Sequence, residues 1–348
     1  MKIALDVLGG DNAPYTNIEG AASYINEFGD SASDLILVGD SNIIKSKIID
    51  YNIDSSKINI IHTTDAIDMN ARSSRVFREQ PNSSLVKSIK LVADGSAQAV
   101  VSAGNTGALL SSALFLIGKI SGIKRPAFAP YIPNSTNGFI LCDVGANVDT
   151  KPIHLIQFAL MAEAYIKHLK NLENPKVALL NIGLEENKGN ELTKSTYPIL
   201  KEHFKNFIGN IESRDIMNNK ADVVICDGFT GNIVLKLTEG IIAHIINWIY
   251  NDLKSTDIDD NSKYNIKKIV ENIILSLDHE EHGATPLLGI NGIVMKCHGA
   301  ATPKSIKNAI IAAQNNVKNN LVKEISNQLL KHSNITENQL NINEANVL

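Results

Sequence analysis

Short apolar runs alternate with longer amphipathic segments along most of the chain. Each run covers four or five residues, and the runs lie at Ile3–Val7, Leu35–Val38, Ile58–His62, Ala99–Ser102, Phe139–Asp143, Val177–Leu180, Phe207–Ile211, Val223–Cys226 and Ile293–Lys296. Between most of them, segments such as Ser83–Val92 and Ile153–Leu169 carry apolar residues at i, i+3 and i+4, the spacing of one helix face. This alternation predicts an α/β fold with a mostly parallel sheet covered by helices on both faces.

The last third of the chain departs from this alternation. Residues 233–277 are predicted to form two consecutive helices, the first at Ile233–Leu253, that leave the sheet as a helical excursion. A closing helix is expected at about Ser305–Lys331, so that residues 1–332 form a single domain. The Asn-rich residues 333–348 are expected to be a disordered tail.

The composition limits the partners that the protein can have. Its 348 residues carry a net charge of -4 at pH 7, so the chain as a whole does not attract nucleic acid. The aromatic content of 5% also argues against a stacking surface for single strands. No leader with a basic start and an apolar core is visible, and no uninterrupted apolar stretch approaches about 18 residues. We therefore expect a cytoplasmic protein whose contact with a membrane is peripheral.

Three widely spaced cysteines, Cys142, Cys226 and Cys297, each lie in an apolar run. This setting favours reduced core thiols over a catalytic thiol. It also excludes a disulfide framework.

Several of the predicted strands end in turns rich in glycine and asparagine. These turns read Gly9-Gly10-Asp11-Asn12-Ala13-Pro14, Ala103-Gly104-Asn105-Thr106-Gly107, Asp143-Val144-Gly145-Ala146-Asn147 and Asp227-Gly228-Phe229-Thr230-Gly231-Asn232. In an open parallel sheet, loops at the carboxyl ends of strands converge on the crevice where ligands bind. The four turns therefore predict one site.

Two of these turns have the features of an anion site. Gly104–Gly107 precedes the apolar helix predicted at Ala108–Ile117, where backbone N–H groups and glycines allow close approach of an anion. Asp227–Asn232 repeats this arrangement, although a turn without a ligand, with Thr230 as a simple N-cap, explains the same residues. Lys188 follows another strand and either adds an ammonium to the crevice or is an ordinary exposed lysine.

Motifs of other enzyme classes are missing. No Walker A sequence, no G-x-G-x-x-G at a strand end and no G-x-S-x-G occurs, which argues against a nucleotide-binding enzyme and a serine hydrolase. His279-Glu280-Glu281-His282 matches neither order of the zinc-protease helices and is expected to be a solvated loop. The sequence therefore predicts no cofactor and no metal.

Taken in order along the chain, the glycine-rich turns resemble one known family. The matching segments are Ala4–Asp6 with Gly9–Pro14, Ser102–Ala108, Asp143–Asn147, Lys188–Leu192, Asp227–Asn232 and Leu288–Gly292. They resemble the acyl-acyl-carrier-protein:phosphate acyltransferases of bacterial phospholipid synthesis from residue 1 to about Gly299. The family motif usually reads Gly-Gly-Asp-His-Ala-Pro, and in this chain Asn12 replaces the histidine.

The resemblance implies a fold, an activity and a set of partners. The fold would be a three-layer α/β/α sandwich like that of isocitrate and isopropylmalate dehydrogenases. The activity would be transfer of a fatty acyl group from acyl carrier protein to inorganic phosphate, which makes acyl phosphate for phosphatidic acid synthesis. A homodimer, loose membrane association and a membrane-bound glycerol-3-phosphate acyltransferase as partner are also implied.

Such a reaction needs a held phosphate and a stabilised oxyanion, but no protein nucleophile. Lys188 and Asn232 are the predicted catalytic residues. The predicted phosphate and acyl ligands are Asp6, Gly9, Gly10, Asp11, Gly104, Asn105, Thr106, Gly107, Asn147, Gly228, Thr230 and Gly231. The predicted surface for the acidic carrier protein, which is otherwise a solvated basic face, comprises Arg72, Arg75, Arg78, Lys87 and Lys90.

Three other functions fit parts of the pattern. A phosphotransacetylase-like enzyme would use a coenzyme A thioester, and a decarboxylating dehydrogenase would need nicotinamide and metal ligands that the motifs do not supply. A non-catalytic membrane scaffold would keep the long helix but would not need four convergent glycine turns.

Overall fold

The computed structural model describes residues 1–71, 75–134, 137–255, 258–277 and 283–332. The predicted C-terminal tail, the His279–His282 segment and Arg72 lie outside these residues.

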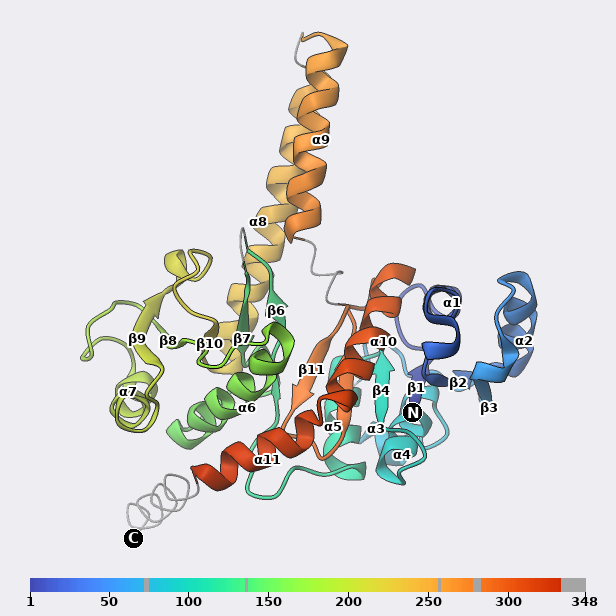
Figure 1. Cartoon of the computed structure of the whole chain (residues 1–348), viewed down its shortest axis with the longest axis horizontal. Helices are drawn as coiled ribbons and strands as arrows, with labels where there is room; N and C mark the ends of the chain where they lie inside the picture. The colour runs from blue at the N-terminus through green and yellow to red at the C-terminus, as the bar shows by residue number, and fades with distance from the viewer. Residues whose placement is uncertain (72–74, 135–136, 256–257, 278–282, 333–348) are drawn as a thin grey trace.

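The strands form two sheets where the sequence pattern predicts one (Figure 1). The first sheet has the order β3 (Ile58–His62), β2 (Asp34–Gly39), β1 (Lys2–Asp6), β4 (Ala99–Ser102), β12 (Ile293–Lys296), β11 (Thr285–Leu288) and β5 (Ala127–Phe128). The second sheet has the order β6 (Tyr131–Ile132), β7 (Phe139–Cys142), β10 (Val223–Ile225), β8 (Val177–Asn181) and β9 (Phe207–Glu212). Most neighbours are parallel, as predicted, and antiparallel pairing is limited to the pairs that contain β5, β6 or β11.

Helices cover the sheets and confirm the α/β class. They are α1 (Tyr15–Phe28), α2 (Ser41–Asp50), α3 (Val76–Glu79), α4 (Ser84–Ala93), α5 (Thr106–Leu116), α6 (Pro152–Lys170), α7 (Glu191–His203), α8 (Gly228–Ser255), α9 (Asp260–Leu277), α10 (Pro303–Lys318) and α11 (Leu321–Lys331). The single closing helix expected at Ser305–Lys331 is wrong. The chain divides there into α10 and α11 because Asn320 adopts a left-handed conformation with φ 51°.

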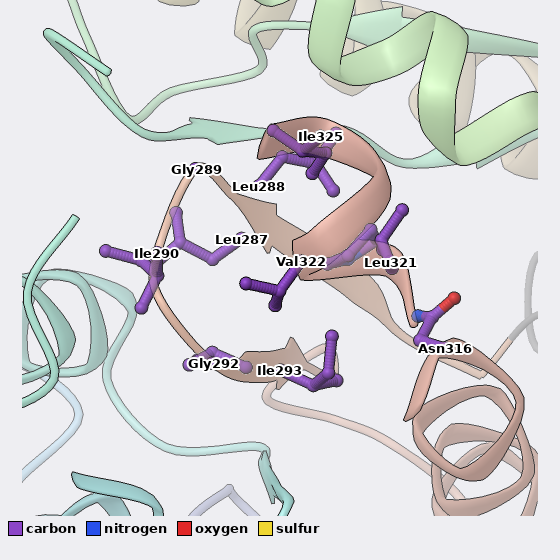
Figure 2. A pocket seen from close by; sticks show the side chains of 12 residues that line it. Leu287, Leu288, Gly289, Ile290, Gly292, Ile293, Asn316, Leu321, Val322 and Ile325 are labelled. Atoms are coloured by element: carbon purple, nitrogen blue, oxygen red, sulfur yellow. The ribbon is translucent and has the colours of Figure 1, made fainter. Parts of the chain in front are cut away.

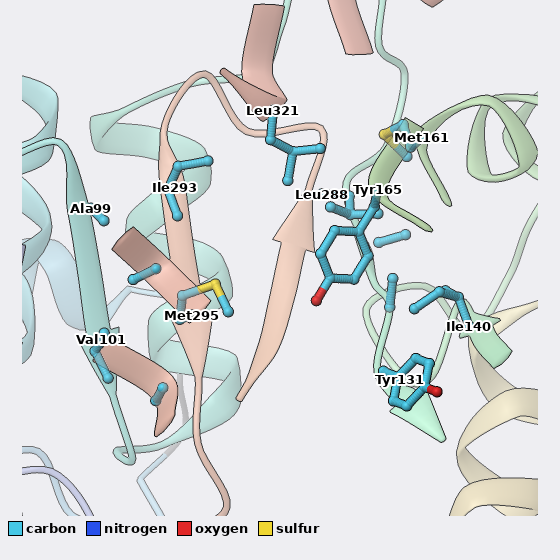
Figure 3. Packing of buried hydrophobic residues seen from close by; sticks show 14 of the residues in the cluster. Ala99, Val101, Tyr131, Ile140, Met161, Tyr165, Leu288, Ile293, Met295 and Leu321 are labelled. Carbon is cyan, nitrogen blue, oxygen red and sulfur yellow. The ribbon is translucent and has the colours of Figure 1, made fainter. Parts of the chain in front are cut away.

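Two hydrophobic cores lie on opposite faces of the sheets, and each takes residues from both sheets. Ile3 and Leu5 of β1 point into one core together with α1, α6 and α10, whereas Ala4 points into the other with α4 and α5. Figure 3 shows the first core passing from Val101 of β4 to Ile140 of β7. The strands therefore form the middle layer of three, because side chains alternate between the two faces.

Phe128 joins the two sheets at their carboxyl ends. It belongs to β5 of the first sheet, yet its backbone N–H donates to the Asp143 carboxylate at 3.0 Å, and its carbonyl accepts from the Val144 N–H at 3.2 Å. The carboxyl ends of the parallel strands of the two sheets are consequently next to each other at this point.

Helices α8 and α9 project from the body as a hairpin (Figure 1). This confirms the predicted excursion, but α8 begins at Gly228 and not at Ile233, so the fourth glycine turn is the first helical turn. The exposed apolar side chains along α8 recur every three or four residues, at Phe229, Ile233, Leu237, Ile241, Ile245 and Trp248. Within the described residues, α8 is long and apolar enough to cross a membrane, which the search for uninterrupted apolar runs did not predict.

Gly231 fixes the base of α8 and gives a stability prediction. A Cβ at this position would lie 1.9 Å from the Asp143 carbonyl oxygen, so Gly231→Ala forces the helix away from its loop. We expect a loss of about 1–3 kcal/mol in the free energy of unfolding, as for other overpacked sites. The matched control is Gly240→Ala in the same helix, where a Cβ meets nothing within 4 Å. Alanine at position 240 should raise the free energy of unfolding by roughly 0.5–1 kcal/mol. Urea unfolding that gives the two variants the same stability would contradict these expectations.

Candidate active site

A buried carboxylate organises the edge of the first sheet. Asp6 ends β1 and is fully buried, and it accepts hydrogen bonds from the hydroxyls of Ser84 at 2.5 Å and Ser102 at 2.6 Å. Burial raises the pKa of the Asp6 carboxyl, and the two hydroxyls partly offset this rise. Ser102 also accepts the Gly104 N–H at 3.0 Å, so Asp6 holds the glycine turn in place and is not free for a ligand.

The first turn packs against the second through glycine. A Cβ on Gly9 would lie 2.3 Å from an Asp6 carboxylate oxygen and 2.7 Å from the Gly104 nitrogen, so only glycine fits. Gly10 has φ +108°, and the following Asp11 N–H donates to the Gly299 carbonyl at 2.8 Å. The structure therefore brings the predicted residues of these two turns together.

Lys296 lies among these turns, although the sequence pattern did not single it out. It ends β12, whose parallel pairing with β4 places its ammonium 3.4 Å from the Ala103 carbonyl. Burial lowers the pKa of Lys296, while the negative charges of Asp6 and Asp11 act in the opposite direction. The positive charge of Lys236 of α8 lowers this pKa further.

The start of α5 offers unpaired backbone donors. The Asn105 carboxamide oxygen caps the helix by accepting the Ala108 N–H at 2.9 Å, and its nitrogen donates to Met69. Asn105 therefore shapes the turn and does not contact a ligand through its amide. The N–H groups of Thr106 and Gly107 have no acceptor within the described part of the chain. Such donors at a helix N-terminus attract anions.

A second buried carboxylate organises the edge of the second sheet. Asp143 accepts hydrogen bonds from the N–H groups of Phe128, Ala146 and Asn147 and from the Asn147 side-chain amide, at 2.8–3.1 Å. Burial raises the pKa of Asp143, and these donors oppose the rise. The Asn147 amide also donates to Pro126 at 2.7 Å, so Asn147 is a structural residue of the loop.

The first turn of α8 does not supply the N–H groups that the sequence suggested. Gly228, Thr230 and Gly231 already donate to the Asn147 carbonyl, the Asp227 carboxylate and the Asp227 carbonyl. Asp227, and not Thr230, is the residue that caps the helix, because its second oxygen also accepts the Thr230 hydroxyl at 2.7 Å.

Asn232 differs from the other two asparagines of the site. It is exposed on the first turns of α8 and faces Gly145, which has φ +127° and is also exposed. Its carboxamide makes no hydrogen bond to any described residue. Asn232 is therefore free to donate to a ligand.

Lys188 shares this edge, because β8 lies beside β10. Its backbone closes its own loop, with its N–H donating to Glu185 and its carbonyl accepting from Asn181, and its side chain is exposed. No hydrogen bond joins Lys188 and Asn232 among the described residues.

The predicted docking residues lie around the first sheet. Arg75 precedes α3 and Arg78 lies in its last turn, where the Arg78 guanidinium is 5.2 Å from the centre of the Phe77 ring. Lys87 and Lys90 lie on α4, where their ammonium groups donate to the carbonyls of His62 and Pro81. The fifth residue, Arg72, is not described.

All three cysteines are buried and free, which confirms that they are core residues. Burial raises the pKa of Cys142 and Cys226 well above the usual value, and it raises that of Cys297 to about 12. None is therefore a thiolate near pH 7, even though His298 follows Cys297 directly in the sequence.

A small apolar cavity is lined in part by the Leu288–Gly292 segment (Figure 2) and lies away from the four glycine-rich turns at strand ends. It has a volume of about 10 Å³ and lies between the β11–β12 turn and α11, lined by Leu288 and Ile325 among others. This turn precedes β12, whereas Lys296 ends that strand, so the cavity lies at the opposite edge of the sheet. Within the described residues, no cluster of three or more histidine, cysteine or acidic side chains is placed to hold a metal.

Known proteins resemble this chain in sequence and in fold. Residues 1–324 match the family model described as fatty acid synthesis protein. A phosphate acyltransferase of Clostridioides difficile is 41% identical over 97% of the chain and 99% of its own length, and one of Dictyoglomus turgidum is 43% identical over 95% and 98%. A solved phosphotransacetylase from Streptococcus pyogenes has a TM-score of 0.59 at 16% identity, covering 90% of this chain and 94% of that one, which shows a shared fold. The chain belongs to the phosphate acyltransferases, an acyltransferase family of lipid synthesis.

Proposed function

We propose that the enzyme transfers a fatty acyl group from acyl carrier protein to inorganic phosphate and so forms acyl phosphate for phospholipid synthesis. The proposal is supported by the half-buried ammonium of Lys296, which lies 3.4 Å from the Ala103 carbonyl, and by the N–H groups of Thr106 and Gly107, which have no acceptor among the described residues and belong to the same Ala103–Gly107 turn. A cation together with free backbone donors forms a site for a small oxyanion such as phosphate.

In the proposed reaction, a phosphate oxygen attacks the thioester carbonyl directly. The new C–O bond forms as the C–S bond breaks, and the carrier thiolate leaves and takes a proton from water. Phosphate near pH 7 is largely the dianion, with a second pKa of roughly 6 to 7, so it needs no general base. Lys296 would hold the phosphate, and Asn232 would donate to the oxyanion, with Lys188 adding positive charge from the neighbouring loop.

The test is release of free carrier thiol from palmitoyl-acyl carrier protein, measured with and without phosphate. The proposal requires thiol release that depends on phosphate and that is unchanged by a chelator. Release that is equally fast without phosphate would contradict it. Activity with acyl-coenzyme A but none with the carrier thioester would favour the phosphotransacetylase-like alternative.

The exposed stripe of α8 suits both proposed associations of the enzyme. An apolar stripe of this length on a projecting helix is typical of an interface. We assign its first part to the homodimer and its far end, near Trp248, to peripheral contact with the cytoplasmic face of the membrane. There the product could pass to a membrane-bound glycerol-3-phosphate acyltransferase. Leu253 is only 7% exposed within the hairpin and is not available to lipid.

One pair of variants separates the two associations. Ile241→Glu with Ile245→Glu should convert the dimer into monomers in light scattering, because each places a charge in an apolar interface. Trp248→Glu should leave the dimer intact and weaken flotation with lipid vesicles. Unchanged mass in the first variant or unchanged flotation in the second would contradict the corresponding assignment.

A further inference from the structure

Four basic side chains surround the start of α6. Lys119, Lys124 and Arg125 come from the segment before β5, and Lys151 immediately precedes the helix. Lys119, Arg125 and Lys151 are exposed, and Lys124 is partly exposed. Segments 119–126 and 147–154 contain a single carboxylate, Asp149, so this α6 surface is strongly positive within an acidic protein.

Hydrogen bonds order the segment that carries Lys119 and Lys124. Gln157 of α6 accepts the Lys124 N–H at 2.8 Å and donates to the Gly122 carbonyl at 2.9 Å. The Lys119 ammonium donates to the Lys124 carbonyl at 2.9 Å. No ion pair within the described residues neutralises any of the four side chains. The positive charge of these four side chains is therefore not neutralised by an ion pair among the described residues.

His154 confirms that the four charges are close together. It lies partly buried in the first turn of α6, and its Nδ1 accepts the Lys151 N–H at 3.1 Å. Burial, together with the charges of Arg125, Lys151, Lys119 and Lys124, lowers the pKa of His154 to about 4. Its imidazole is neutral near pH 7, so the positive charge of this surface comes from the lysines and the arginine.

The α6 surface adjoins the candidate active site. Pro126, next to Arg125, accepts the Asn147 side-chain amide at 2.7 Å, and the Asn147 carbonyl accepts the Gly228 N–H at 2.8 Å. The basic surface is thus separated from the base of α8 by one loop. Val148, 63% exposed, adds an apolar group between them.

We infer that Lys119, Lys124, Arg125 and Lys151 form the surface on which the acidic acyl carrier protein docks to present its acyl group to the crevice. This inference rests on the proposed function and identifies the surface that the acyl carrier protein of that reaction contacts. Charge complementarity beside the crevice favours it, because opposite charges at a rim steer and orient a partner. In the basic set on α3 and α4 both described lysines, Lys87 and Lys90, donate to backbone carbonyls, whereas in the α6 surface only Lys119 does so.

The test is a double charge reversal, Arg125→Glu with Lys151→Glu, compared with Lys45→Glu on the exposed face of α2. Steady-state kinetics with palmitoyl-carrier protein would be measured together with calorimetric binding of carrier protein that has no acyl group. We expect the KM for the carrier to rise roughly tenfold and binding to weaken equally, with kcat within about twofold, as for other rim charges. The milder pair Arg125→Gln with Lys151→Gln covers the case in which the reversal prevents folding.

The outcomes separate the docking surface from the proposed function. Unchanged carrier KM and binding in both folded double variants, with normal turnover, would overturn the docking surface and leave the function standing. A raised KM for phosphate at saturating carrier would instead assign these cations to phosphate and would also overturn docking. Wild-type protein that makes no acyl phosphate from the carrier thioester would overturn the proposed function itself.

Discussion

Replacing Lys296 by methionine is expected to lower kcat/KM for phosphate by about 10²–10³-fold, the effect typical of losing one preorganised donor to a charged transition state. Methionine keeps an apolar stem of similar length but removes the ammonium that lies 3.4 Å from the Ala103 carbonyl and that the proposed site offers to phosphate. The loss should be large because a half-buried cation is screened less by water than a surface cation. Initial rates at varied phosphate measure it.

Two controls accompany the Lys296 variant. Lys45→Met removes an exposed lysine of α2 and should change nothing. Lys296→Arg retains the charge and should retain part of the activity, although the larger guanidinium fits the site less well. Equal activity of Lys296→Met and wild type at low phosphate would show that this ammonium does not hold the acceptor.

The proposed role of the Lys296 ammonium makes the activity of the enzyme depend on pH. Burial lowers the pKa of Lys296, so its ammonium loses its proton at a lower pH than an exposed lysine does. Activity that needs the charged form should therefore fall as the pH rises through this lowered value. The Lys296→Arg variant should not show that fall, because a guanidinium stays protonated.

Replacing Asn232 by alanine is expected to lower kcat by about 10²–10³-fold while the KM for phosphate stays near its normal value. The carboxamide of Asn232 is unpaired within the described residues and exposed beside Gly145, so its loss leaves the fold intact and removes a donor for the oxyanion. Asn232→Asp should be equally damaging, since a carboxylate repels the developing negative charge. Rapid quench kinetics with saturating carrier thioester give the relevant kcat.

The other residues at this edge are useful comparisons for Asn232. Asn147→Ala should lower stability, because the Asn147 amide bonds Asp143 and Pro126 inside the loop. Lys188→Ala should have a smaller effect on kcat than Asn232→Ala, because the Lys188 side chain is exposed and its charge is screened. Near-normal turnover of Asn232→Ala with only a raised phosphate KM would mean that Asn232 binds substrate and transition state equally.

The sequence predicts the local elements of this fold better than their pairing. The strand ends and their glycine turns are local patterns, and the structure places Gly9 against Gly104 and Gly228 against Asn147 as one would expect from loops on a shared edge. The division into two sheets was not predictable, because β12 returns across most of the chain to pair with β4. Only this non-local pairing distinguishes Lys296 from an ordinary residue at the end of a strand.

The hydrogen-bond roles of the asparagines also needed the structure. Asn105, Asn147 and Asn232 all lie in glycine-rich turns, and the sequence assigns all three to the site, the first two as ligands and Asn232 as a catalytic residue. In the fold, the side-chain amides of Asn105 and Asn147 form hydrogen bonds with neighbouring backbone groups. The Asn232 amide forms none within the described residues. The position at which α8 begins decides this difference, and helix boundaries are the part of a sequence pattern that is least sharply defined.

Transfer of labelled phosphate distinguishes phosphate from water as the acceptor of the acyl group. Purified enzyme would be incubated with palmitoyl-carrier protein and [³²P]phosphate, and the organic-soluble label that hydroxylamine destroys would be compared with the free carrier thiol released. Direct attack of phosphate on the thioester requires one labelled acyl phosphate for each thiol. Thiol release without incorporation of label would show that water, and not phosphate, accepts the acyl group.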